Sequence, residues 1–181
     1  MTRLLLNLLV FGLFAVNCCV ADEANNSEDV AVLSVIAQSM CASLASSGEA
    51  RYLVLSDESE QIKSDGGKES LRQEAVASLV SRNSVSYPLP KITLCPTIRL
   101  FKASVIRSAE KKFAESDDYI SSFRRAFPGA FGPTDMSLPG YTENGTKALV
   151  VVSNAGGSFY YVLHKQGGQW RIEKIVFRSI A

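Results

Sequence analysis

The chain has 181 residues, of which 46% are hydrophobic and 20% are charged, and its formal net charge is +1. This length suits one domain with a core of its own. The near-neutral charge argues against nucleic-acid binding, because proteins that bind DNA or RNA use a surplus of basic residues to displace counterions.

The first 21 residues have the pattern of a secretory signal peptide. Arg3 is the only charged residue before Asp22, and an apolar run followed by NCCVA separates the two. A basic start, a short apolar core and a small residue at Ala21 are typical of a segment that is removed during export. We therefore expect cleavage after Ala21 and a mature chain, residues 22–181, that forms a single exported domain.

Two alternatives to this cleavage remain open. The apolar run is shorter than the roughly 20 residues that a membrane span needs, which argues against an uncleaved anchor. Lipid attachment at Cys18 or Cys19 would make an envelope lipoprotein, although Asn17 stands where a small residue is expected.

No later apolar run is expected to span a membrane. Without Arg3 the mature chain has 18 basic (19 minus 1) and 18 acidic residues, so it is formally neutral.

Cys41 and Cys95 are the cysteines of the expected mature chain. Export usually leads to an oxidising compartment, so one interpretation is a disulfide between them. The other interpretation is two separate buried thiols, because free cysteine is among the most buried residue types. Sequence spacing does not decide between them, since it does not show whether the two side chains meet.

Apolar spacing predicts helices and a strand in the first half of the chain. A helix is expected over residues 30–48, with Ser27 as its cap. Its apolar residues recur at three- and four-residue steps and are Leu33, Ile36, Ala37, Met40, Cys41 and Leu44. A strand is expected at residues 51–57, and a second helix at residues 69–83.

Prolines shape the middle of the chain. Three of them between residues 88 and 96 exclude a helix and disfavour a central strand. We expect an extended segment there, with residues 97–101 as an edge strand. Two short helices should follow, capped by Ser108 and Ser116.

The C-terminal part predicts an antiparallel meander. Three β-prone segments, 147–154, 158–166 and 169–177, are separated by glycine-rich turns, and Asn144-Gly145 is a hairpin signal before the first. With helices between the early and the late strands, the chain should form an α+β domain. We expect the N-terminal helix and the short helices to pack on an antiparallel sheet that ends in this meander.

The last of these segments changes phase along its length. Alternation puts Trp170 and Ile172 on one face, and Ile175 and Phe177 on the other. A β-bulge near residues 173–174 would explain the change, as would burial of both faces.

Four stretches of the C-terminal half occur together in a recognisable order. They read FRRAFPGAFG, MSLPGY, TKALVVV and SFYYVLHKQGGQW. From about Arg99 onward this order resembles an uncharacterised family of small secreted bacterial proteins. Phe159 departs from the family, which usually has glycine there, and the turn at 155–157 lacks the cysteine pair of some relatives. The resemblance implies a secreted bacterial protein and no catalytic residues. The layout also resembles NTF2-like domains, at the level of fold only.

The motifs of several catalytic classes are missing from the sequence. His164 is the only histidine, and it lies inside an expected strand with no sign of a nucleophile or carboxylate partner. A zinc site needs three or four nitrogen or sulfur ligands, which one histidine and two distant cysteines do not supply. Phosphate-loop, nucleophile-elbow and dinucleotide patterns do not occur. We therefore expect no catalytic residue, no metal site and no cofactor.

Three charged pairs have ordinary explanations. Neighbouring residues point different ways, so the acidic pairs at 57–58 and 117–118 are better explained by a solvated loop and a helix cap than by a catalytic pair. Arg124-Arg125 suits the end of a solvated helix, with an anionic partner as the alternative.

One candidate binding surface lies on the second strand of the meander. Alternation puts Phe159 and Tyr161 on one face and Tyr160 on the other. If that second face is uncovered, Tyr160, Val162 and His164 would line a shallow binding surface.

These observations favour a non-catalytic binding or interaction domain in the periplasm, in the cell envelope or outside the cell, with an unidentified protein or small molecule as its partner. A small NTF2-like enzyme with a pocket between helices and sheet is the alternative, and it needs carboxylates from distant segments. A lipid-anchored envelope protein is the third possibility. A pocket that holds a carboxylate with a raised pKa would favour the enzyme, whereas a flat, uncovered apolar face would favour the binding domain.

Overall fold

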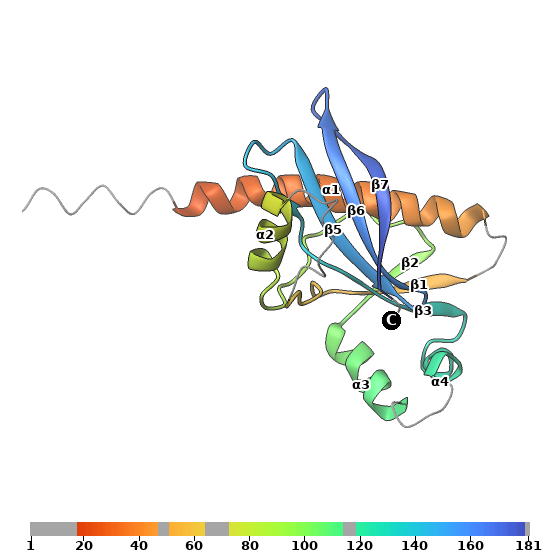
Figure 1. Ribbon diagram of the computed structural model, residues 1–181. Helices are drawn as coiled ribbons and strands as arrows, with labels where there is room; N and C mark the ends of the chain where they lie inside the picture. The colour runs from red at the N-terminus through yellow and green to blue at the C-terminus, as the bar shows by residue number, and fades with distance from the viewer. Residues whose placement is uncertain (1–17, 47–50, 64–72, 114–118, 180–181) are drawn as a thin grey trace, which may run out of the picture.

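The computed structural model describes residues 18–46, 51–63, 73–113 and 119–179 of the chain. Within these residues four helices cover both faces of a seven-stranded sheet (Figure 1). In chain order the elements are α1 (Cys18–Ser46), β1 (Tyr52–Ser56), α2 (Gln73–Arg82), β2 (Ile98–Phe101), α3 (Ala103–Phe113), α4 (Tyr119–Ala126), β3 (Ala130–Met136), β4 (Gly140–Tyr141), β5 (Lys147–Asn154), β6 (Gly157–Gln166) and β7 (Gln169–Ser179). The predicted α+β class is confirmed.

The sheet has the strand order β2-β1-β3-β5-β6-β7, and β4 pairs with β5. β5, β6 and β7 are antiparallel neighbours, so the predicted meander is confirmed. β2 is an edge strand, as expected. The sheet is mixed rather than antiparallel throughout, because β1 runs parallel to both β2 and β3.

β3 is a central strand that was not predicted from the sequence, and it contains a proline. Pro133 lies opposite Val54, directly after the register between β1 and β3 shifts. The pairing of β3 with β5 begins only at Thr134. Proline is tolerated at such an irregularity, where its missing N–H breaks no regular ladder.

The phase change in β7 comes from a β-bulge at Glu173. Leu163 pairs with Ile172 and Val162 pairs with Lys174, so Glu173 is an extra residue. Alternate residues of β6 point to the same face of the sheet, and the β7 residues paired with them point to that face too. Those partners are Trp170, Ile172, Ile175 and Phe177. The predicted bulge is confirmed, and it brings all four apolar side chains to the same face.

α1 lies across one face of the sheet, behind β5 to β7 in the view of Figure 1. The stripe predicted for this helix is buried or half-buried against that face. The helix begins at Cys18 and not at the expected cap Ser27, because the chain is already helical before this serine. It therefore continues through the expected cleavage site after Ala21. Residues 1–17 of the predicted signal peptide lie outside the described residues.

One stretch of the described helices, Ser27–Ser46, has the length and the mean hydropathy, 1.5, of a membrane span. By length and hydropathy, the expectation that no later segment reaches membrane length is wrong. Leu33, Ile36 and Met40 are nevertheless buried against the sheet, so this helix uses its apolar side in the core of the domain.

A disulfide joins α1 to the segment that precedes β2. The Sγ atoms of Cys41 and Cys95 are 1.94 Å apart, and both residues pack against the core beneath α1. Of the two interpretations that the spacing left open, the disulfide is the one found. It connects residues 54 positions apart.

Polar contacts dock the first half of the helix. The buried carboxylate of Asp29 accepts hydrogen bonds from both terminal nitrogens of Arg82, at 3.0 and 2.7 Å. Glu28 accepts hydrogen bonds from Lys165 Nζ at 2.6 Å and from Trp170 Nε1 at 2.7 Å. These contacts link α1 to α2, β6 and β7, and local sequence patterns contain no sign of them.

Substituting valine for Thr134 is expected to stabilise the protein by about 1 kcal/mol. Thr134 is fully buried in β3, and its hydroxyl has no hydrogen-bond partner in the described part of the chain. Valine has nearly the same shape and removes a polar group that loses its hydration on folding. The free energy of unfolding from urea titrations measures the effect. Thr142→Val is the control, and it should destabilise because the Thr142 hydroxyl donates to Asn144 Oδ1 at 2.9 Å. A clear loss of stability in Thr134→Val would contradict this account.

Candidate functional site

The sheet face opposite α1 carries two separate apolar clusters. One lies beneath α2 and includes Leu149, Val151 and Tyr160. The other lies between the sheet and helices α3 and α4, and it includes Val54 of β1 and Phe123 of α4. Between these two clusters the strands carry hydrophilic side chains, where a continuous core would have apolar ones.

We call these side chains the polar band, and it consists of Ser56, Glu60, Asp135, Ser153 and Ser158. Asp135 and Ser153 are opposite each other on β3 and β5, as are Ser153 and Ser158 on β5 and β6. The Ser153 hydroxyl donates to Glu60 Oε2 at 2.8 Å and lies 2.6 Å from the Ser158 hydroxyl. Glu60, Ser153 and Ser158 thus form one hydrogen-bonded group, and Asp135 forms a second one with Ser56 beside it.

Burial raises the pKa of both carboxylates of the polar band, Glu60 and Asp135. It raises the pKa of Glu60, against the opposing effects of the Ser153 hydrogen bond and of the Arg178 guanidinium. Burial, and then the nearby charge of Glu110, raise the pKa of Asp135 to about 6. Carboxylates with such shifts are concentrated at functional sites, although structural networks also produce them.

Asp135→Asn is expected to stabilise the protein by about 2 kcal/mol at pH 7.5 and to have no effect at pH 4. The pKa of Asp135 is about 6 in the folded protein, against an ordinary value of 3.8. Between these values the folded state holds the proton more tightly than the unfolded state. Stability therefore falls as the pH rises from about 4 to about 6, and the loss is complete above that range.

Urea titrations of both proteins from pH 4 to pH 8 measure this difference. Glu143→Gln is the control, because it makes the same change of carboxylate to amide in an exposed turn. Its effect should not depend on pH across the window of Asp135. A stability difference for Asp135→Asn that is equally independent of pH would contradict the expectation.

The acidic pair at 57–58 anchors the start of α3. Asp57 Oδ1 accepts a hydrogen bond from the Ala103 N–H at 2.7 Å, and Glu58 pairs with Arg107 at 2.9 Å. The interpretation of this pair as a solvated loop was therefore wrong. So was the expected cap at Ser108, because α3 begins five residues earlier, where a distant carboxylate supplies the cap. The expected cap Ser116 lies outside the described residues, as does the acidic pair at 117–118.

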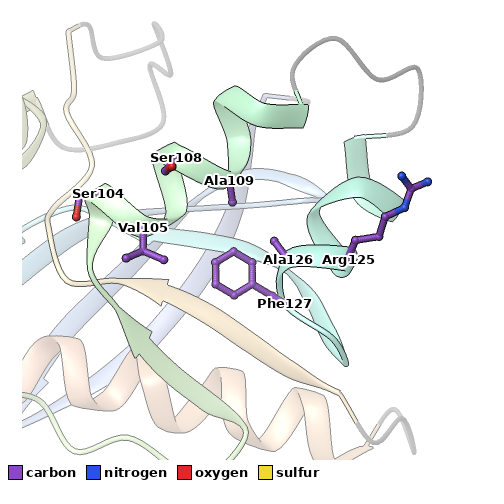
Figure 2. Close-up of a pocket in the computed structure, with 7 residues that line it drawn as sticks. All are labelled: Ser104, Val105, Ser108, Ala109, Arg125, Ala126 and Phe127. Atoms are coloured by element: carbon purple, nitrogen blue, oxygen red, sulfur yellow. The ribbon is translucent and has the colours of Figure 1, made fainter.

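A hollow of about 570 Å³ lies between α3 and α4. It is lined by Ser104, Val105, Ser108, Ala109, Arg125, Ala126 and Phe127. Figure 2 shows Val105 and Ala109 of α3 on one side, with Ala126 and Phe127 on the other. The Arg125 side chain extends outward from the rim. In the part of the chain that the structure describes, Ser104, Ser108 and Arg125 make no side-chain hydrogen bond or ion pair.

The hollow and the polar band lie against different faces of α3. Arg107 and Glu110 are the α3 residues whose charges act on Asp135. At about 100° per residue they project from the helix opposite Ser108 and Val105, which line the hollow. The lining contains no carboxylate, so the hollow does not have the composition expected of an acid–base catalytic pocket.

Tyr160 does not contribute to the binding surface that was predicted on β6. This residue is fully buried, and the guanidinium of Arg178 lies 5.7 Å from its ring centre. The prediction failed because α2 covers this face, which alternation within one strand does not show. Val162 and His164 are half-buried on the same face, and His164 Nδ1 has no hydrogen-bond partner within the described residues.

The exposed apolar side chains of the meander lie on the opposite face. Ile175 and Phe177 are 49% and 47% exposed, and Phe159 packs edge-on against Phe177 with ring centres 5.6 Å apart. The bulge in β7 directs these side chains to the face of α1. Among the described residues of the meander, only Ile175 and Phe177 are exposed large apolar side chains, so this face is not the flat, uncovered apolar face expected of a binding domain.

The two arginines at the end of α4 have different surroundings. Arg124 donates hydrogen bonds to the carbonyl oxygens of Ala130 and Phe131, at 3.2 and 3.4 Å, so it ties α4 to β3. Arg125 is exposed at the hollow. Of the pair, only Arg125 is placed to bind an anion.

Comparisons of the chain with protein-family models, with curated proteins and with solved structures found no match. The resemblance of the C-terminal half to secreted bacterial proteins stays a prediction. The analogy with NTF2-like domains also stays one.

Proposed function

We propose that the protein is an exported, non-catalytic binding domain that holds a small amphiphilic anion in the hollow between α3 and α4. The hollow itself is the observation that carries the proposal. Its volume of about 570 Å³ lies within the range of small-molecule sites, roughly 300–1,000 Å³. Export is supported by the signal-like N-terminal sequence and by the disulfide, which is typical of oxidising compartments.

The lining sets the class of ligand. Val105, Ala109 and Phe127 offer an apolar wall for an alkyl or aryl group. The guanidinium of Arg125 presents several donors in one plane and suits an oxyanion. Ser104 and Ser108 add hydroxyl groups that are not engaged elsewhere in the described chain. An alkyl chain with a sulfonate or carboxylate head group matches these features.

Isothermal titration of the mature, disulfide-bonded protein with octane-1-sulfonate tests this proposal. Ala126→Trp fills the hollow and is expected to weaken binding by at least about tenfold. Arg125→Gln removes the cation and should weaken binding to a similar extent. Ala77→Trp is the matched control, because it adds the same side chain to an exposed position on α2. Equal affinities in the two tryptophan variants, or no measurable binding by the unmodified chain, would refute the proposal.

A lipid anchor remains an alternative within the same proposal, since it differs only at the N-terminus. The intact mass of the protein purified from its own host decides the matter. A mature chain that starts at Asp22 supports the soluble form. A start at Cys18 or Cys19 with an added lipid mass identifies the lipoprotein.

A further inference from the structure

We propose that two copies of this protein form a two-fold symmetric dimer, in which the outer edge of β7 pairs antiparallel with β7 of the second copy. In this pairing Ile172 lies opposite Ile175 of the second copy. Trp170 lies opposite Phe177 in the same way. Neither the hollow nor its proposed ligand takes part.

β7 is a long edge strand. In the described part of the chain β6 is its one strand neighbour, so alternate residues of β7 direct their backbone N–H and C=O groups away from the sheet. Seven of its eleven residues are exposed, compared with one of ten in β6. The opposite edge strand, β2, has only four residues, and short edges are a common protection against pairing with another chain. β7 does not have this protection.

The bulge makes β7 symmetric about the point between Glu173 and Lys174. The apolar residues on either side of this point pair with alternate residues of β6, so their side chains share one face and their backbone groups have one orientation. They are Trp170, Ile172, Ile175 and Phe177. A two-fold axis at this point opposes residues of equal orientation, as antiparallel pairing requires. It defines the one register that sets all four opposite one another.

A bulge at an edge normally disturbs pairing with a regular strand. In the proposed dimer the two bulges meet at the axis, so Glu173 and Lys174 of one copy lie opposite Lys174 and Glu173 of the other. Both strands therefore have the same number of residues between their apolar pairs.

The apolar residues of β7 supply the attraction. Ile175 and Phe177 are 49% and 47% exposed, whereas Trp170 is buried and Ile172 packs against the core beneath α1. The proposed pairing places the exposed end of each strand beside the core end of the other. Each apolar pair is formed twice because of the symmetry, and the side chains that water now contacts become covered.

The charged residues at the axis favour this register. Glu173 and Lys174 are both exposed, and Glu173 of each copy faces Lys174 of the other. Lys147 and Arg171 add positive charge on the same face, and Glu173 accepts a hydrogen bond from Lys147 Nζ at 2.7 Å. A register that moves Glu173 away from Lys174 would therefore bring positive charges together.

Sedimentation velocity of the mature, disulfide-bonded protein at increasing concentrations tests the inference. A monomer–dimer equilibrium is expected, and Ile175→Lys should weaken it by at least about tenfold, because the new charge lies opposite Ile172. Leu100→Lys is the matched control. It makes the same kind of change at an exposed apolar residue of the other edge strand, and it should leave the equilibrium unchanged.

Exchanging the two central charges tests the register. Glu173→Lys and Lys174→Glu should each weaken the dimer, because each places like charges opposite one another. The double variant, Glu173→Lys with Lys174→Glu, restores opposite charges across the axis and should recover most of the affinity. Circular dichroism of the variants confirms that these exposed changes leave the fold intact.

Amide hydrogen exchange locates the interface independently. The outward-facing amides of β7 should exchange about fivefold more slowly in concentrated than in dilute protein, while β2 amides should not change. A chain that stays monomeric at about 1 mM would overturn the inference and leave the β7 edge to a strand of another protein. A dimer that Ile175→Lys and Leu100→Lys weaken equally, or one that the charge exchange fails to restore, would also overturn it.

Discussion

Removing the disulfide by Cys41→Ser together with Cys95→Ser is expected to lower the free energy of unfolding by about 4 kcal/mol. The bridge connects residues 54 positions apart, so it restricts a large part of the unfolded chain. It also ties α1 to the segment before β2, and α1 packs across one face of the sheet. Losing the bridge therefore favours the unfolded state and loosens the attachment of the helix.

Urea titrations with and without a reducing agent measure this effect. Reductant should destabilise the unmodified protein by a similar amount and leave the double serine variant unchanged, which separates the bridge from general effects of the reagent. A loss below about 1 kcal/mol would show that the unfolded chain is already restricted in other ways.

Gly140→Ala is expected to destabilise the protein by at least about 3 kcal/mol. Gly140 in β4 packs directly on the backbone of α2. An added Cβ would lie 2.3 Å from the carbonyl oxygen of Ala75 and 2.3 Å from the amide nitrogen of Leu79. A helix backbone does not yield as a side chain does, so α2 or β4 must move. Such a shift would also disturb the cluster that buries Tyr160.

Gly156→Ala is the matched control for this substitution. Gly156 lies in the exposed turn between β5 and β6, and an added Cβ would come no closer than 3.3 Å, to the side-chain oxygen of Asn154. We expect the control to change the unfolding free energy by no more than about 0.5 kcal/mol. Similar stabilities of the two alanine variants would contradict the close packing of β4 on α2.

Local patterns were sufficient for the strands of the meander. β5 has the predicted boundaries, and β6 and β7 differ from prediction only at their ends. Alternation and glycine turns act within a few residues, so they can be read from the sequence directly. The same reasoning located the bulge at Glu173, because two runs of alternating apolar residues met there out of phase.

The parts of the candidate site come from contacts that are distant in sequence. Ser153 and Glu60 are 93 residues apart, and the carboxylate that caps α3 is 46 residues from Ala103. No local pattern marks such partners. For the same reason nothing in the sequence indicated that Asp57 caps α3 or that Asp135 lies in a polar band where its pKa is raised.

The amino-acid sequence alone determined the α+β class, the meander with its bulge, the core-facing stripe of α1 and the two cysteines available to pair. Each depends on the order of apolar, polar and turn residues over short stretches, and backbone geometry converts that order into structure. Only the tertiary structure decided which faces of the sheet are covered, and so why Tyr160 is buried and Phe177 is exposed. It also decided that α3 has the polar band on one side and the hollow on the other. These features depend on how helices pack on a sheet, and that packing is a property of the whole chain.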